Sequence, residues 1–185
     1  MRDFQRDFNK NFNKITDLVE SVVSDVAEQV TSPTAKKVLN SALDLVKPHF
    51  ISLGARISVL STSQVELTLP RKARNLDEHG QILPGVQISA AVEAYRLLWK
   101  RNAPEGEFQV VIKNVQGRFL KFTKSDLRIR GELGDLAREA RWAELSKSKQ
   151  SRHQMTLHFF DEQNQICSEV EIESELYLKE MLEWK

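Results

Sequence analysis

One glutamate, Glu93, stands in the middle of a nearly continuous apolar segment, LPGVQISAAVEAYRLLW, which spans residues 83–99. Burying a carboxylate without a partner is costly, so Glu93 must either pair with another group or face a solvated cleft. In a helix, Val86, Ala90 and Leu97 would lie on its face. A carboxylate among small apolar residues can act as a general base or as a nucleophile toward a bound carbonyl carbon. An ion pair with an arginine, or a hydrogen bond to a backbone N–H across a dimer interface, is the alternative without catalysis.

The start of the same segment can supply a second catalytic group. Pro84 and Gly85 are typical of a helix start, and the first N–H groups of a helix have no acceptor within the helix. The N–H groups of Gly85 and Val86 would carry the positive end of the helix dipole and could polarise a carbonyl. One such oxyanion donor lowers a reaction barrier by roughly 3 kcal/mol. Glu93 and Gly85 are therefore the candidate catalytic residues of this segment, and the ion pair stays open as the alternative for Glu93.

Other chemistry-bearing residues are less well arranged. His153 and His158 are five positions apart on an expected strand, so they point to opposite faces and cannot share a metal ion. The basic loop with Arg71, Lys72 and Arg74 could meet phosphate groups, although a solvated loop is the simpler interpretation. The sequence contains no P-loop, no dinucleotide-binding glycine motif and no Gly-x-Ser-x-Gly motif. No metal site is predicted.

Charge and cysteine content exclude several classes of partner. The formal net charge is +1 over 185 residues, so no global field attracts nucleic acid or an acidic membrane. The segment GRFLKFTK, residues 117–124, mixes aromatic and basic residues as single-strand nucleic-acid binders do, but the alternation on both sides favours a sheet strand. A single cysteine, Cys167, rules out a disulfide framework and is expected to be a small strand residue. With no signal peptide or membrane span expected, a cytoplasmic location is predicted.

Hydrophobic periodicity divides the chain into helical and extended parts. Residues 4–30 repeat apolar side chains every three or four positions, and a second helix is expected over 33–46 before Pro48. After Gly54 the period becomes two, which predicts strands. A charged connector, GDLAREARWAELSKSKQ, is expected to be partly helical. The alternating apolar residues are Ile57, Val59, Val65, Leu67, Leu69, Phe108, Val110, Ile112, Leu127, Ile129, Leu133, Met155, Leu157, Phe159, Ile166, Val170, Ile172 and Leu176.

The helix over residues 83–99 decides the fold class. It is apolar almost all round, so a flat sheet on one side would leave much of it exposed. A strongly curved antiparallel sheet could wrap it, and the number of expected strands permits one. The prediction is an α+β hotdog fold with extra N-terminal helices, divided into a helical extension at 1–31 and a hotdog domain at 32–185.

From about Ser41 to Tyr177 the chain resembles hotdog-fold acyl-CoA thioesterases, particularly the phenylacetate-type branch and its uncharacterised relatives. The resemblance rests on KPHFISLGARISVL, on LTLPRKARN, on the central helix and on HFFDEQNQICSEVEIESELYL near the end. In this alignment PGVQISAAVE lies over the helix-entrance motif, so Gly85 matches its first glycine and Glu93 its acid. The resemblance implies hydrolysis of an acyl thioester on coenzyme A or acyl carrier protein. It also implies a homodimer or dimer of dimers, with coenzyme A only as part of the substrate and no separate cofactor.

The chain departs from the family pattern at three positions. Pro84 replaces the usual histidine, Val86 replaces the second glycine, and Glu78 stands where relatives offer an asparagine or glutamine to the carbonyl. Asn75 and His79 are nearby substitutes for that donor, Val86 would line the entrance, and Arg71 and Arg74 are the expected phosphate contacts. A non-catalytic acyl-binding or protein-interaction module therefore remains the alternative. The N-terminal helix could dock on a protein or a membrane surface, or pack on its own domain or dimer partner.

Overall fold

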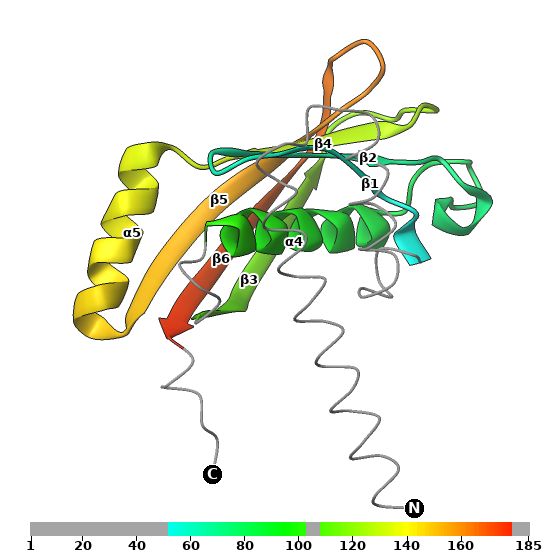
Figure 1. The fold of residues 1–185 in the computed structure, drawn as a ribbon. Helices are drawn as coiled ribbons and strands as arrows, with labels where there is room; N and C mark the ends of the chain where they lie inside the picture. Colours follow the sequence, from blue (N-terminus) through cyan, green and yellow to red (C-terminus); the bar gives the residue numbers. More distant parts are fainter. Residues whose placement is uncertain (1–51, 103–107, 179–185) are drawn as a thin grey trace, which may run out of the picture. The chain divides into compact units, whose positions relative to one another are not determined.

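The computed structural model describes residues 52–102 and 108–178 (Figure 1). From Leu53 onward these residues belong to one compact unit. The helices expected over 4–30 and 33–46 lie outside the described residues, as does the expected boundary between 1–31 and 32–185. Among the described residues, the helices α4 (Pro84–Arg101) and α5 (Asp135–Ser148) lack the long apolar run that a bilayer-crossing helix requires.

Six strands form a single antiparallel sheet in the order β1-β2-β4-β5-β6-β3. The strand β6 lies between β5 and β3 and pairs with both along most of its length. The strands β1 and β3 form the two edges. The elements in chain order are β1 (Arg56–Leu60), β2 (Gln64–Leu69), the 3-10 helix η1 (Ala73–Asn75), α4 (Pro84–Arg101), β3 (Phe108–Phe119), β4 (Leu127–Glu132), α5 (Asp135–Ser148), β5 (Gln150–Phe160) and β6 (Ile166–Leu178).

The period-two pattern correctly predicted the strands. On β2, the alternating Val65, Leu67 and Leu69 are fully buried, while the residues between them are half-buried. The region from 57 to 69 is a strand pair, and β1 also carries an irregularity between Ile57 and Val59. Apolar side chains on one face of β1, β2, β4, β5 and β6 therefore build the core against α4.

Two expectations about strand ends need correction. In the segment 117–124, β3 ends at Phe119, and the N–H groups of Leu120 and Lys121 both donate to the Cys167 carbonyl. Because these two N–H groups share one carbonyl, the regular pairing of β3 with β6 ends at this point. Leu133 was expected on a strand but lies just beyond β4. Cys167 is a buried residue of β6, as expected.

The helix α4 lies across the curved sheet (Figure 1). Pro84 occupies the first helical position, where a missing N–H costs nothing. Gln87 and Tyr95 face the sheet, since both hydrogen-bond to serines of β6. The prediction of a helix wrapped by an antiparallel sheet is confirmed for this part of the chain.

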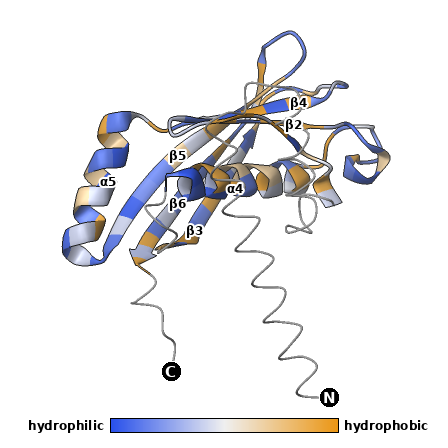
Figure 2. Cartoon of the chain, in the orientation of Figure 1, coloured by the Kyte–Doolittle hydropathy of each residue, from blue (hydrophilic) through white to orange (hydrophobic). Residues whose placement is uncertain are grey.

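The charged connector forms a complete helix, α5, which ends at Lys149 in a left-handed conformation. Its position follows from the sheet: β4 pairs with β5 only over Arg128–Arg130 and His158–Phe160, so the first half of β5 has no strand on that side. The helix α5 packs along this half instead and is largely hydrophilic (Figure 2). It therefore covers a strand edge that would otherwise be open to another chain.

Candidate functional site

The first turn of α4 has one open backbone donor. The Leu83 carbonyl accepts the N–H groups of Val86 and Gln87 at 3.0 and 3.1 Å, and Pro84 has no N–H. Among the described residues, nothing accepts the Gly85 N–H. A Cβ placed on Gly85 would also meet no atom within 4 Å. The expected pair of donors at Gly85 and Val86 is therefore reduced to Gly85 alone, because the half-buried Val86 has already used its N–H.

Buried amides hold this turn in place. The Asn75 carbonyl accepts the Leu83 N–H at 2.9 Å, just before the helix. The Gln87 Nε2 donates to the Ile82 carbonyl at 2.9 Å, and its Oε1 accepts the Ser168 hydroxyl at 2.5 Å. Asn75, Gln87 and Ser168 are all buried. The Gly85 N–H thus has a fixed position relative to β6.

Glu93 lies two turns further along α4 and is 7% exposed. Its Oε1 pairs with Arg96 Nη1 at 3.2 Å. Successive helical residues turn by about 100°, so Glu93, two residues before the sheet-facing Tyr95, points away from the sheet. The ion pair with an arginine that the sequence left open as an alternative is therefore present.

The two expected catalytic groups do not meet within one chain. Eight residues separate Gly85 from Glu93, which places their backbones roughly 12 Å apart along the helix axis. A single carbonyl group cannot contact both groups of the same helix, since each contact requires about 3 to 3.5 Å.

The expected carbonyl donors lie in different environments. Asn75 is 1% exposed, and its Nδ2 donates to the carbonyls of Leu53 and Pro70 at 2.8 and 2.9 Å. Both of its amide hydrogens are used, so Asn75 holds the loop and has none left for a ligand. His79 has a 73% exposed side chain and lies 3.5 Å from the Glu78 carboxylate on the same turn. Neither the Asn75 nor the His79 side chain therefore offers a hydrogen-bond donor at the start of α4.

The two arginines expected to contact phosphate, Arg71 and Arg74, lie in different places. Arg74 lies over Gly54, whose φ is +65°. Arg71 donates its Nε to the Gly80 carbonyl at 3.0 Å and borders a shallow cleft of about 600 Å³. Gly85 and Glu93 are not among the residues that line this cleft, which are Thr68, Arg71, Lys124, Ser125, Asp126, Arg128, Asp161 and Glu162.

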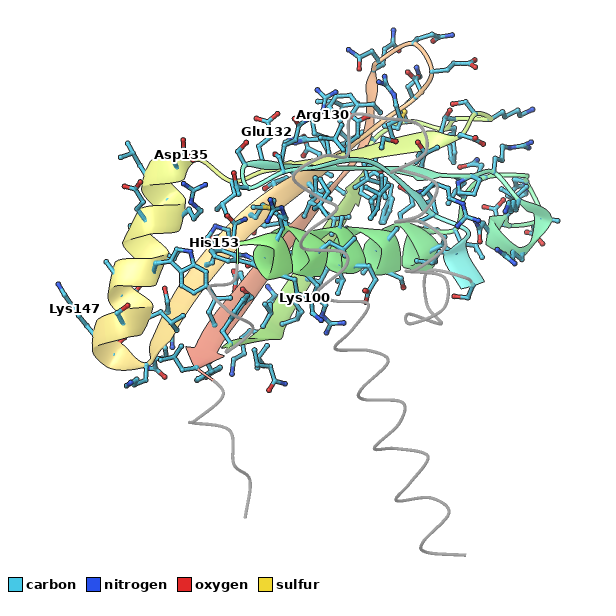
Figure 3. All side chains as sticks on the ribbon, viewed as in Figure 1. Lys100, Arg130, Glu132, Asp135, Lys147 and His153 are labelled. Atoms are coloured by element: carbon cyan, nitrogen blue, oxygen red, sulfur yellow. The ribbon has the colours of Figure 1, made fainter. Side chains whose placement is uncertain are left out.

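A buried hydrogen-bond network on the sheet-facing side of α4 was not anticipated. The Tyr95 hydroxyl bonds to Ser174 Oγ at 2.5 Å and to His153 Nδ1 at 2.9 Å. Burial lowers the pKa of His153 to about 4, with a smaller effect from the Arg141 charge, and burial raises the pKa of Tyr95 to about 12. Both side chains are neutral at neutral pH. Figure 3 labels His153 on β5, between α5 and α4.

Aromatic rings surround this network and fill the interior near the end of α4. The Trp99 ring packs edge-on against His153 at 4.9 Å and against Trp142 of α5 at 6.1 Å between centroids. Phe108 of β3 contacts both tryptophans. The spacing of Tyr95 and Trp99 by one helical turn could have indicated that their rings lie together. The other rings of the cluster could not be foreseen, because they come from distant segments of the chain.

The two strand histidines separate as predicted. His153 faces α4, and His158 lies on the other face, 3.8 Å from Glu169. Within residues 52–102 and 108–178, no three His, Cys, Asp or Glu side chains are placed to hold a metal ion.

Comparisons with known proteins bear on the fold. No protein-family model matches the chain, and neither does any curated protein. A Pseudomonas aeruginosa protein of unknown function, described as a probable thioesterase, matches with a TM-score of 0.66 and 20% identity over 77% of this chain and 95% of that one. A Haemophilus influenzae thioesterase matches with a TM-score of 0.58 and 18% identity over 78% and 91% of the two chains.

A variant of a Staphylococcus aureus thioesterase, in which a glutamine is replaced by alanine, matches with a TM-score of 0.56 and 11% identity over 69% of this chain and 97% of that one. At these low identities the matches establish the fold and nothing finer. The predicted resemblance to hotdog-fold thioesterases is thus confirmed at the level of the fold, and this chain has the hotdog architecture. Membership of the phenylacetate-type branch stays a prediction.

Proposed function

We propose that the protein hydrolyses an acyl thioester carried on coenzyme A or acyl carrier protein. The observation that carries the proposal is the Gly85 N–H, the one donor of the first turn of α4 without an acceptor among the described residues, with open space beside it. A helix N-terminus with a free N–H stabilises the negative charge that develops on a carbonyl oxygen. The fold, which solved thioesterases share, supports the same chemistry.

Glu93 is the proposed base. Its carboxylate would take a proton from a water molecule while the water oxygen attacks the thioester carbonyl carbon. The carbonyl oxygen would accept the Gly85 hydrogen bond as it gains charge. When the C–S bond breaks, the thiolate leaves and receives a proton from the Glu93 carboxyl group. Direct attack by the carboxylate, followed by hydrolysis of the resulting anhydride, uses the same two groups.

Gly85 and Glu93 are roughly 12 Å apart on one helix, so a site that uses both groups must take them from two copies of the chain. If two copies of α4 lie antiparallel about a twofold axis near the exposed Ser89, Gly85 of one copy lies opposite Glu93 of the other. The outer edge of β3, which no strand of the described residues pairs, is twelve residues long and offers the sheet-to-sheet contact that would bring two copies of α4 together. Two such sites would form in each dimer.

Turnover of acyl-CoA substrates of several chain lengths tests the reaction. Glu93→Gln keeps the size of the side chain and removes the base, so hydrolysis should fall by at least about 100-fold. Gly85→Pro removes the N–H and Gly85→Ala keeps it, so only the proline variant should lose a comparable factor. Unchanged hydrolysis in Glu93→Gln would eliminate Glu93 from the reaction.

Mixing two inactive variants tests the shared site. A mixed dimer of Glu93→Gln with Gly85→Pro holds one intact site, so unfolding and refolding an equal mixture should restore about a quarter of normal activity. Each variant refolded alone is the control. Mixed dimers that form but stay inactive would contradict a site built from two copies.

A non-catalytic acyl-binding protein is the second candidate, and one observation favours it. The Glu93 carboxylate is held by Arg96 at 3.2 Å, as in a structural ion pair. This candidate predicts that a non-hydrolysable alkyl-CoA thioether binds while no thioester is turned over. Calorimetry with the thioether, beside the hydrolysis assay, distinguishes the two functions.

A further inference from the structure

A glycine on the edge strand lets an aromatic ring approach α4. A Cβ built on Gly117 of β3 would lie 2.9 Å from Phe119 Cζ and 3.6 Å from Ile88 Cδ1. The Phe119 ring therefore lies over Gly117, in space that any other residue would occupy with its own side chain. Residues two apart on a strand share a face, so Phe119 projects toward α4.

This ring lies close to the open donor. Ile88 follows Gly85 by three residues, which is about one helical turn on the same side of α4. The Gly117, Phe119 and Ile88 contact therefore stands beside the Gly85 N–H. Phe119 is 43% exposed and Ile88 is half-buried. The surface next to the donor is thus apolar and still partly accessible.

The charges near this surface are already matched. Arg118, the residue between Gly117 and Phe119, points to the other face of β3 and pairs with Glu169 at 2.7 Å. Gln87 of α4, on the sheet side, already donates to the Ile82 carbonyl and accepts from the Ser168 hydroxyl. A charged or hydroxylated group placed against Phe119 and Ile88 would lose water without gaining a partner.

We infer that Phe119, seated over Gly117 against Ile88, selects the acyl group of the substrate, and that this group is an unsubstituted alkyl or aryl chain. The inference rests on the proposed function. A thioester whose carbonyl oxygen accepts the Gly85 N–H has its acyl chain beside this turn of α4. An apolar chain covers Ile88 and ends against the Phe119 ring, which therefore limits its length.

The test measures kcat/KM for straight-chain acyl-CoA substrates from acetyl to dodecanoyl, and for phenylacetyl-CoA. Phe119→Ala removes the ring, so the ratio of kcat/KM for long against short chains should rise by at least about ten-fold. Phe122→Ala is the matched control: it deletes the same atoms at a site that is 79% exposed, beyond the end of β3, and should leave the chain-length profile unchanged. Ratios within one variant do not depend on how much of the protein is folded.

Gly117→Ala provides a second variant, which adds atoms beneath the Phe119 ring where Phe119→Ala removes the ring. Its new methyl group must displace the Phe119 ring, so the chain-length profile should change in the normal background and not in a Phe119→Ala background. A Phe119→Ala profile identical to that of the unaltered protein would overturn the inference. So would equal shifts in Phe119→Ala and Phe122→Ala.

Binding separates failure of this inference from failure of the proposed reaction. The affinities of ethyl-, octyl- and dodecyl-CoA thioethers are measured by calorimetry for the same variants. If no thioester is hydrolysed but Phe119→Ala shifts the chain-length dependence of Kd, the reaction is wrong and the role of Phe119 stands. If hydrolysis occurs and neither profile shifts, the reaction stands and the role of Phe119 is wrong. If the unaltered protein neither turns over nor binds these compounds, both are wrong.

Discussion

The two ends of α4 are built in opposite ways. At the N-terminal end, the Gly85 N–H has no acceptor among the described residues, and the neighbouring Phe119 is 43% exposed. At the C-terminal end, Tyr95 and Trp99 are completely buried among rings from three other elements. One helix thus combines an end with open polar and apolar surface and an end whose two aromatic side chains are fully buried. Stability and chemistry can therefore be altered separately along it.

The largest expected effect is at the packed end. Trp99→Ala should lower the free energy of unfolding by about 3 to 5 kcal/mol, because it leaves a large cavity between α4, α5 and β3. Ile88→Ala, on the same helix but half-buried, should cost only about 1 kcal/mol. Urea unfolding measures both. Equal losses would mean that the two ends are packed alike.

Tyr95→Phe is the next largest change. It keeps the ring and removes the hydroxyl, so His153 Nδ1 and the Ser174 hydroxyl lose their common partner inside the protein. The expected loss is about 2 to 3 kcal/mol. Tyr177→Phe removes a hydroxyl that bonds to Glu175 at a partly exposed site and should cost less than about 1 kcal/mol. A larger loss for Tyr177→Phe would contradict the importance of the buried network.

Acid should weaken the packed end through His153. Burial lowers its pKa to about 4 in the folded protein from an ordinary value of 6.5, so the unfolded chain binds a proton first as the pH falls. The free energy of unfolding should therefore decrease between about pH 6.5 and 4, by about 2 kcal/mol after allowance for partial exposure, and show no further His153 contribution below pH 4.

His153→Gln removes this titration and serves as its control. Glu175 should cause a second loss of stability at lower pH, because hydrogen bonds from Lys113 and Tyr177 hold its pKa at about 2. Its contribution is present above pH 4.5 and is lost as the pH falls toward 2. In His153→Gln only the loss of stability at low pH should remain, to which Asp77 and Asp161 also contribute because hydrogen bonds lower the pKa of each carboxyl group. An unchanged slope between pH 6.5 and 4 would show that another group is responsible.

The smallest expected effect is at the open end. Gly85→Ala should change the free energy of unfolding by less than about 1 kcal/mol, and in the stabilising direction, because a Cβ there meets no atom within 4 Å and alanine favours the helix. Gly117→Ala makes the corresponding change where a Cβ would lie 2.9 Å from Phe119 and should be destabilising. Thermal unfolding compares the two. A destabilising Gly85→Ala would indicate that the space beside the donor is occupied.

The sequence predicted the elements better than their partners. Alternation identified the buried apolar residues of β2 and most of those of β4 and β6, although Ile166 at the start of β6 is 41% exposed. Helical spacing identified α4, and its apolar character required a wrapping sheet. The same pattern could not show that one end of α4 is closed by Trp142 and His153, since these residues approach from segments that are remote in sequence.

The sequence predicted which residues belong to the candidate site but not the hydrogen bonds that they make. Gly85 and Glu93 were singled out because of their types and spacing, but the use of the Val86 N–H by Leu83 depends on how the chain enters the helix. Asn75 was expected to offer its amide to a ligand, and the folded loop instead uses both hydrogens on Leu53 and Pro70. A one-dimensional pattern does not reveal which polar groups a loop will satisfy internally.

The position of β6 between β5 and β3 has a consequence for folding during translation. β6 pairs with both β5 and β3 and carries Val170, Ile172 and Leu176 into the core, yet it is the last strand of the described chain to leave the ribosome. The apolar α4 emerges much earlier, and at the usual rate of translation it waits on the order of several seconds for this strand. During that interval β3 lacks β6, the one strand that pairs with it among the described residues. A nascent chain of this architecture should therefore depend on chaperones that bind apolar segments, and a translational pause before β6 should increase aggregation.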